Sequence, residues 1–230
     1  MKVVFCIPTM TRPYQETLDS LAASVPLFDE AGIEHAMVSE IGCPYISNAR
    51  ATMLRKALDA GADVIVFIDH DVSWDAGDLL KLVLTKGNVV AGTYRFKRDE
   101  ESYMGHILSY KDGTPMVREE DGALHSFDAP AGFLKITKEA VNKIYTSFPG
   151  LVYGDKYHPS IDLFNHGAHK GTWYGEDYAF CRRWLECGDG LFTVPDMNIN
   201  HHAGDKVYKG NLHEFLLKQP GGSNDTNGAS

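Results

Sequence analysis

The chain has few cysteines and no long apolar segment, and these shortages exclude two classes of protein. Its 230 residues include four cysteines, which form no C-x-x-C pair and no dense framework, so a disulfide scaffold is not expected. No stretch approaches the roughly 18 consecutive apolar residues of a membrane span. The apolar start is interrupted at Pro8, and we interpret it as a strand rather than a signal peptide. We therefore expect reduced thiols and a cytoplasmic protein, in the host cytoplasm if the source is viral.

Positive charge is also in short supply. Lys and Arg total 22 against 31 Asp and Glu, which gives a formal net charge of −9. Such an acidic chain lacks the basic surface with which proteins bind nucleic acid. If the chain binds phosphates, local positive charge has to be supplied, and a divalent cation is its simplest source.

The first 93 residues alternate between strand and helix patterns. The run Val64–Ile68 is entirely apolar, which is typical of a central parallel strand covered on both faces. The alternation predicts an α/β fold with a doubly wound, mainly parallel sheet flanked by helices. Expected strands cover residues 2–7, 33–38, 64–72 and 89–93, and expected helices begin at Pro13, Ser47 (as N-cap) and Asp75 and end near Gly32, Gly61 and Gly87.

The pattern changes after residue 93. Turn dipeptides at Asp112-Gly113 and Asp121-Gly122 predict a small antiparallel insert. Thr137 is the expected N-cap of a short helix, residues 150–171 are expected to form a long loop, and a helix is expected over residues 176–187. We expect one domain over residues 1–218 and a flexible, polar tail over residues 219–230.

Asp69-His70-Asp71, a D-x-D motif, is the strongest chemical signal. It follows the apolar run directly, and ligands of open α/β sheets bind at the carboxyl ends of strands. In an extended strand Asp69 and Asp71 would face the same side and His70 the other. Paired carboxylates repel each other unless a cation lies beside them, and Mg²⁺ or Mn²⁺ prefers such oxygen ligands. The alternative is a solvated Asp69 with Asp71 capping the next turn.

Two further clusters are candidates for chemistry. Glu176 and Asp177 begin a predicted helix, where one of them can act as a general base, although acidic residues are common in a first turn anyway. The helix start is expected to lower the pKa of that base. His201 and His202 are adjacent and point in different directions in an extended chain, so only one is expected to bind a metal.

Six short motifs occur in order over about residues 2–215: Pro8-Thr9, Ser47-Asn48-Ala49-Arg50, Asp69-His70-Asp71, Gly132-Phe133-Leu134, Glu176-Asp177 with the following Phe180-Cys181-Arg182-Arg183-Trp184, and His202-Ala203-Gly204. This ordered set resembles the GT-A glycosyltransferases, and especially the small enzymes of large viruses, phages and bacteria, such as those that glycosylate chlorella-virus capsid protein. The resemblance implies a single GT-A domain and metal-dependent transfer of a sugar from a nucleotide-diphosphate sugar to an acceptor hydroxyl with inversion. The implied donor is a UDP-sugar, and the acceptor is a glycan, a protein or a small molecule.

The resemblance also implies roles for individual residues. Asp71 is expected to bind Mn²⁺ or Mg²⁺ together with His202 and Asp69, and Asp177 is expected to be the catalytic base, with Glu176 beside it. Asp69 is also expected near the ribose. The remaining expected nucleotide-sugar contacts are Pro8, Thr9, Arg12, Asn48, Arg50, His70, Gly132 and Phe133.

Three other functions remain open on the sequence. A nucleotidyltransferase shares the strand and metal arrangement but usually has a glycine-rich loop after its first strand, and residues 8–13 contain no glycine. A metal-dependent hydrolase would use the aspartates of the D-x-D motif with both histidines, but usually has a denser cluster. The third is a nucleotide-sugar-binding protein that has lost catalysis.

Overall fold

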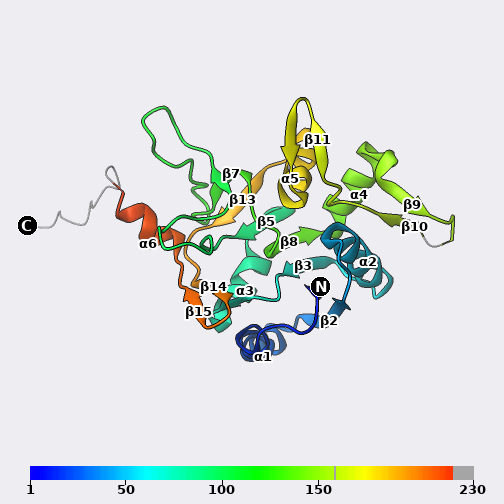
Figure 1. Cartoon of the computed structure of the whole chain (residues 1–230), viewed down its shortest axis with the longest axis horizontal. Coiled ribbons are helices and arrows are strands. Elements are labelled where there is room, and N and C mark those ends of the chain that lie inside the picture. Colours follow the sequence, from blue (N-terminus) through cyan, green and yellow to red (C-terminus); the bar gives the residue numbers. More distant parts are fainter. Residues whose placement is uncertain (158, 220–230) are drawn as a thin grey trace, which may run out of the picture.

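An eight-stranded sheet forms the centre of the molecule, and helices cover both of its faces (Figure 1). The structure is a computed structural model, and it describes residues 1–157 and 159–219; the expected tail from residue 220 onward lies outside the described residues. The strand order is β2 (Glu34–Ile41), β1 (Lys2–Thr9), β3 (Val64–Ile68), β8 (Phe133–Thr137), β5 (Val89–Gly92), β13 (Leu191–Val194), β7 (Leu124–Asp128) and β6 (His106–Ile107).

The sheet is mixed. β1 is parallel to β2 and β3, as the alternation of strands and helices predicts, and β13 is parallel to β5. The sequence pattern did not indicate β8, which lies antiparallel between β3 and β5. The expectation of a mainly parallel sheet therefore holds for the β2–β1–β3 side, whereas the pairings of β8, β7 and β6 are antiparallel.

Apolar residues on both sides of each central strand explain the two helical layers. Along β1, Val4 and Cys6 face one core, and Val3 and Phe5 face the other. Helices α2 (Ile46–Asp59), α4 (Lys138–Ser147) and α5 (Glu176–Glu186) pack against the first face, and α1 (Gln15–Glu30) and α3 (Ala76–Leu84) against the second. Within the described ranges, no helix combines the length and apolarity that a membrane span needs.

Several local predictions are confirmed, and others are wrong. Thr137 caps α4 by accepting a hydrogen bond from the backbone N–H of Ala140, and Gly113 and Gly122 lie in turns with φ of 88° and 73°. Ser47 is buried inside α2, whose N-cap is Tyr45 instead. The sequence did not indicate the short helix α6 (Leu212–Leu217).

The segment that was expected to be a long loop contains two hairpins. A short 3₁₀ helix (Pro149–Leu151) leads into β9 (Val152–Gly154), which pairs with β10 (Pro159–Ile161). β11 (Gly167–His169) then pairs with β12 (Thr172–Tyr174), and this hairpin leads directly into α5. These strands are only three residues long, too short for a clear alternating pattern in the sequence.

A small second sheet brings the two histidines next to the D-x-D motif. β4 (Val72–Trp74) begins directly after Asp71 and pairs antiparallel with β14 (Ile199–Ala203), which also pairs with β15 (Lys206–Tyr208). The register sets His201 opposite Val72, and the N–H of His202 donates to the carbonyl oxygen of Asp71 at 2.8 Å.

Candidate functional site

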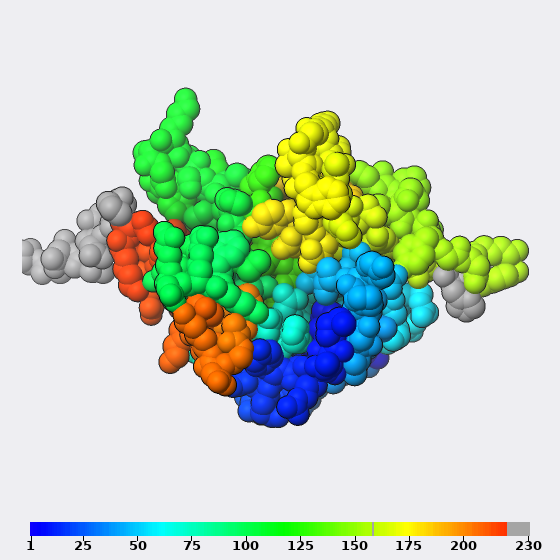
Figure 2. All heavy atoms as spheres, in the orientation of Figure 1, coloured from blue at the N-terminus to red at the C-terminus, as the bar shows by residue number. Residues whose placement is uncertain are grey.

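The residues singled out from the sequence gather at the carboxyl ends of β1 and β3. Figure 2 shows the chain segments that carry them meeting around the middle of one face: the blue end of β1, the cyan segment after β3, the yellow region of β12 and α5 and the orange β14–β15 hairpin. Parallel strands place their carboxyl ends on one edge of a sheet, so residues from distant parts of the chain come together there.

Asp69 lies at this edge, immediately after β3. Its N–H donates to the carbonyl oxygen of Gly132 at 2.9 Å, which joins it to the segment before β8. One carboxylate oxygen accepts a hydrogen bond from Arg50 at 2.9 Å, and the other accepts one from the hydroxyl of Tyr94 at 3.0 Å. Both oxygens are thus held in place, which orients the carboxylate before any ligand binds.

The D-x-D motif does not continue the strand, so the argument from alternating faces is wrong. β3 ends at Ile68, and Asp69, His70 and Asp71 form the bend that leads to β4. The carbonyl oxygen of His70 accepts hydrogen bonds from the N–H of Tyr14 and the hydroxyl of Thr17. These bonds fix the bend against the start of α1.

Asp71 has separate partners. Lys97 donates to its Oδ2, and Nε2 of His201 lies 3.6 Å from the same oxygen. Burial would raise the pKa of Asp71, but its contacts with His201 and Lys97 outweigh burial and hold that pKa well below its usual range. Asp71 is therefore an ionised carboxylate that already contacts one cation, the ammonium group of Lys97.

The structure places His201, not His202, beside Asp71. Adjacent residues of β14 face opposite sides, as the sequence predicts for an extended chain. Nδ1 of His201 lies 2.8 Å from the carbonyl oxygen of Arg95, which leaves Nε2 toward Asp71. Nε2 of His202 instead lies 2.8 Å from the hydroxyl of Ser73, and its ring packs against Tyr14. The assignment of His202 as the metal-binding histidine is not supported by this geometry.

Arg50 is buried between two carboxylates. Its side chain is 3% exposed, and its guanidinium donates to Asp69 at 2.9 Å and to Glu176 at 2.6 Å while lying over the ring of Phe164. Arg50 therefore joins the end of β3 to the start of α5. The sequence placed it in contact with the nucleotide, but this burial leaves its side chain no open face for a donor.

Glu176 and Asp177 have different surroundings at the start of α5. The carboxylate of Glu176 is paired with Arg50, whereas Oδ1 of Asp177 accepts a hydrogen bond from the N–H of Tyr178 at 2.8 Å. Burial, and then the negative charge of Glu176, raises the pKa of Asp177 to about 6. The expectation that the helix start lowers this pKa is wrong, because burial and the neighbouring carboxylates outweigh the hydrogen bond from the N–H of Tyr178 and the charge of Arg50.

Gly132 is required by close packing against the site. A Cβ at this position would lie 2.0 Å from the hydroxyl oxygen of Tyr94 and 2.2 Å from Oδ2 of Asp69. Phe133, which was expected beside the donor sugar, is fully buried and packs against Trp74 with ring centroids 5.1 Å apart. Phe133 is thus a core residue, because β8 turns its side chain into the layer under α1 and α3.

The remaining expected nucleotide contacts lie at the edge of the site or beneath it. Pro8 and Thr9 end β1 and are buried, and the hydroxyl of Thr9 has no hydrogen-bond partner among the described residues. Arg12 and Asn48 are exposed, and the amide oxygen of Asn48 lies 3.6 Å from the thiol of Cys43. Only the last two offer a side chain that a ligand can reach from solvent.

Two site residues were missed in the sequence. Tyr94 and Lys97 follow β5, whose carboxyl end lies at the same sheet edge as that of β3. The rule that located the D-x-D motif also applies to the residues after β5, so the position of the predicted strand at 89–93 was a usable signal. Burial and the charge of Asp69 raise the pKa of Tyr94 well above its usual value, so its hydroxyl is a hydrogen-bond donor.

The side chains around Asp71 offer few donor atoms for a metal ion. No group of three or more His, Cys, Asp or Glu side chains positioned to hold a metal occurs among the described residues. Mg²⁺, however, commonly takes only one or two carboxylates and completes its shell with water and phosphate oxygens. Asp71 supplies one such carboxylate, with Nε2 of His201 3.6 Å from its Oδ2, and the ammonium group of Lys97 occupies a cation position on the same oxygen.

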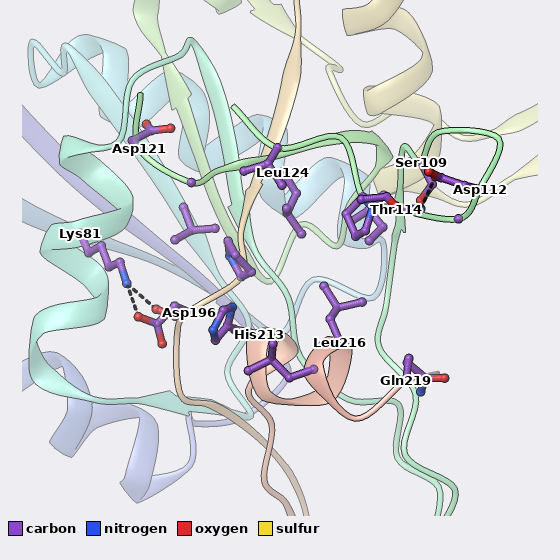
Figure 3. Close-up of a pocket in the computed structure, with 18 residues that line it drawn as sticks. Lys81, Ser109, Asp112, Thr114, Asp121, Leu124, Asp196, His213, Leu216 and Gln219 are labelled. Carbon is purple, nitrogen blue, oxygen red and sulfur yellow. Dashed lines mark hydrogen bonds and ion pairs between the residues drawn. The ribbon is translucent and has the colours of Figure 1, made fainter. Parts of the chain in front are cut away.

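A cavity of about 690 Å³ lies elsewhere, between α6, the end of β13 and residues 107–124 (Figure 3). Leu124 and Leu216 line it, and Lys81 is paired with Asp196 at its border. None of the site residues predicted from the sequence lines this cavity. The cavity is therefore separate from the site around Asp69, Asp71 and Asp177.

Comparisons with known proteins gave structural matches only. No protein-family profile and no curated protein sequence matches the chain. Its structure is similar to that of S. aureus TarS 1–349, with 10% identity, a TM-score of 0.45, and coverage of 84% of this chain and 58% of that one. The chain thus spans less than two thirds of the TarS structure.

Two further matches are glycosyltransferases. One is a mutant of Drosophila β1,4-galactosyltransferase 7 in complex with manganese, UDP-Gal and xylobiose, with 14% identity, a TM-score of 0.42, and coverage of 100% of this chain and 76% of that one. The other is a glycosyltransferase involved in glycosylation of the major capsid of PBCV-1, with 13% identity, a TM-score of 0.30, and coverage of 64% and 66%. They are of the class that the motif order resembles, but likenesses this distant do not assign an activity.

Proposed function

We propose that this chain is a glycosyltransferase that moves a sugar from a nucleotide-diphosphate sugar, with UDP as the expected nucleotide, to an acceptor hydroxyl. The observation that carries the proposal is Asp177, a partly buried carboxylate at the start of α5 whose pKa is raised to about 6. A base with a pKa near the working pH is well matched to removing a proton from a hydroxyl. The ordered carboxylates at the end of β3 support a donor site beside it.

The residues of this site divide the work. Asp177 accepts the proton of the acceptor hydroxyl while the oxygen of that hydroxyl attacks the anomeric carbon of the donor sugar and the nucleoside diphosphate leaves. Attack on the face opposite the diphosphate inverts the anomeric centre. Arg50 pairs with Asp69 and Glu176. It thereby holds the base helix, α5 with Asp177 at its start, against the donor edge, the carboxyl end of β3 with Asp69 and Asp71. Glu176 is a less suitable base, because its carboxylate is already engaged by Arg50.

Asp71 and His201 are the residues that would hold a divalent cation. Such a cation, when bound, offsets the negative charge that develops on the leaving diphosphate. This assignment replaces His202 by His201, and it keeps Asp69 as a carboxylate oriented by Arg50 and Tyr94 rather than as a metal ligand.

The proposal is tested by release of UDP from a panel of UDP-sugars, with Mn²⁺ and a mixture of sugar acceptors. Asp177→Asn is expected to lower the transfer rate by about 100-fold or more, the usual scale for losing a general base. Its affinity for UDP is expected to stay near that of the wild type. Glu186→Gln, which changes an exposed carboxylate at the other end of α5, is the matched control and should leave the rate unchanged.

Two results would contradict the proposal. If the wild-type protein binds neither UDP nor any UDP-sugar in thermal-shift measurements, a UDP-sugar is not its donor. A full transfer rate in Asp177→Asn would remove the base, and loss of UDP affinity together with the rate would mark Asp177 as a structural residue of the helix start.

A further inference from the structure

Lys97 is a cation at the site to which the proposed function gives no role. It lies in the segment between β5 and β6, and its ammonium group donates to Oδ2 of Asp71. Its side chain is 36% exposed, whereas that of Asp71 is 12% exposed. The ammonium group thus occupies the solvent side of a largely buried carboxylate.

The backbone near Lys97 is fixed at this position. The carbonyl oxygen of Arg95 accepts a hydrogen bond from Nδ1 of His201, and the N–H of Phe96 donates to the carbonyl oxygen of Ser102 at 3.0 Å. The backbone of Arg95 also forms an isolated antiparallel β-bridge with that of Tyr103. Lys97 therefore starts from an anchored backbone, and its flexible four-carbon stem is the part that can move.

Negative side chains outnumber positive ones where a diphosphate would enter the site. Three carboxylates, those of Asp69, Glu176 and Asp177, surround the end of β3 and the start of α5, and Asp71 lies close by. Arg50 is buried and already shared between two of them. A diphosphate that enters beside these groups meets like charges, and Lys97 is the partly exposed cation that contacts Asp71.

We propose that Lys97 is the diphosphate-binding lysine of the donor site, and that it occupies the cation position on Asp71 while no divalent cation is bound there. A lysine acts on phosphate as a mobile point charge, so the same ammonium group can pair with Asp71 or with a phosphate oxygen one stem-length away. The phosphate part of this inference rests on the proposed function. The competition for Asp71 rests on the contact alone.

These two roles predict opposite effects of one substitution. Lys97→Met removes the competitor from Asp71, so the variant should bind Mn²⁺ alone more tightly, by about 3-fold or more for a pair that is partly exposed. The same variant has lost a partner of the diphosphate, so at saturating Mn²⁺ it should bind UDP more weakly, by about 10-fold for one charge-assisted contact. A residue that only supported the fold would weaken both.

Isothermal titration calorimetry with Mn²⁺ alone, and then with UDP at saturating Mn²⁺, measures both effects without relying on activity. Lys97→Arg keeps the charge and should bind Mn²⁺ no more tightly than the wild type while retaining most of the UDP affinity. Arg98→Met is the control for net charge: it removes the same charge one residue along, where the guanidinium lies over Phe96 and bonds to Ser102. It should change neither affinity by more than about 2-fold.

Unchanged or weaker Mn²⁺ binding by Lys97→Met, with circular dichroism showing a folded chain, would overturn the competition, as would a wild type that binds no Mn²⁺. Unchanged UDP binding by Lys97→Met would overturn the phosphate role, and so would equal effects of Arg98→Met. A wild type that binds Mn²⁺ but no UDP would contradict the proposed function instead, and the Mn²⁺ titrations would still decide whether Lys97 holds the cation position.

Discussion

Replacing Arg50 by Met tests the connection between the base helix and the donor edge. Methionine has a similar length and can fill the space over Phe164, so the change removes mainly the charge and the two hydrogen bonds. Asp69 and Glu176 would then lie side by side without their shared cation. Breaking a buried ion pair by removing one partner typically costs about 3–5 kcal/mol.

The partial exposure of the two carboxylates lowers that expected cost. Their side chains are 27% and 26% exposed, so each can recover some hydration once Arg50 is gone. We therefore expect Arg50→Met to destabilise the fold by about 2–3 kcal/mol. For a chain of this size that corresponds to a decrease in Tm of about 4–12 °C.

Urea unfolding of four proteins measures the coupling: wild type, Arg50→Met, Glu176→Gln and the double variant. Glu176→Gln leaves Arg50 paired with Asp69, and in the double variant Asp69 is the one carboxylate that has lost its ion pair, although it keeps the hydrogen bond from Tyr94. The losses should therefore be non-additive, with an interaction free energy of about 1 kcal/mol or more. A cost below about 0.5 kcal/mol for Arg50→Met, or strict additivity, would refute the view that Arg50 holds the two elements together.

Three other outcomes are expected. The value of kcat/KM should decrease as the pH falls below an apparent pKa of about 6, because protonated Asp177 cannot accept a proton. Glu176→Gln should shift this decrease to lower pH, because it removes a negative charge beside Asp177. A value of kcat/KM that does not change between pH 5 and 7 would contradict this. Gly132→Ala should weaken UDP binding in calorimetry by about 10-fold or more, because its Cβ would collide with Asp69; wild-type affinity would show that the site can adjust. His201→Ala should weaken Mn²⁺ binding by about 10-fold or more, and His202→Ala by clearly less, since only the first ring lies at Asp71; the reverse order in calorimetric titrations would restore the ranking made from the sequence.

The first three strands and helices could be predicted because their signals are local. Apolar runs such as Val64–Ile68, and glycines such as Gly61 with φ of 82°, mark strands and helix ends within a few residues. The position of β8 between β3 and β5 could not be predicted in this way. Strand order depends on pairing between residues 43 to 73 positions apart, and a five-residue apolar run does not indicate its neighbours.

The site was predicted in part for a related reason. The carboxyl-edge rule located Asp69 and Asp71, since it needs only the end of a strand. The choice between His201 and His202 needs the register of β14 against β4, which the sequence does not contain. The role of Arg50 depends on burial between two distant elements, so it had no local signal, whereas Lys97 follows the strand predicted at 89–93 and could have been found by the same rule.

The central position of β8 also bears on how the chain can be made in a cell. During synthesis β3 and β5 emerge first, but the strand that joins them ends only at residue 137, and β13 follows more than fifty residues later. Until then the nascent chain exposes the unpaired edges of two strongly apolar strands. Ribosome-bound chains that stop before residue 133 should therefore be the species most prone to aggregate, and the ones that chaperones protect.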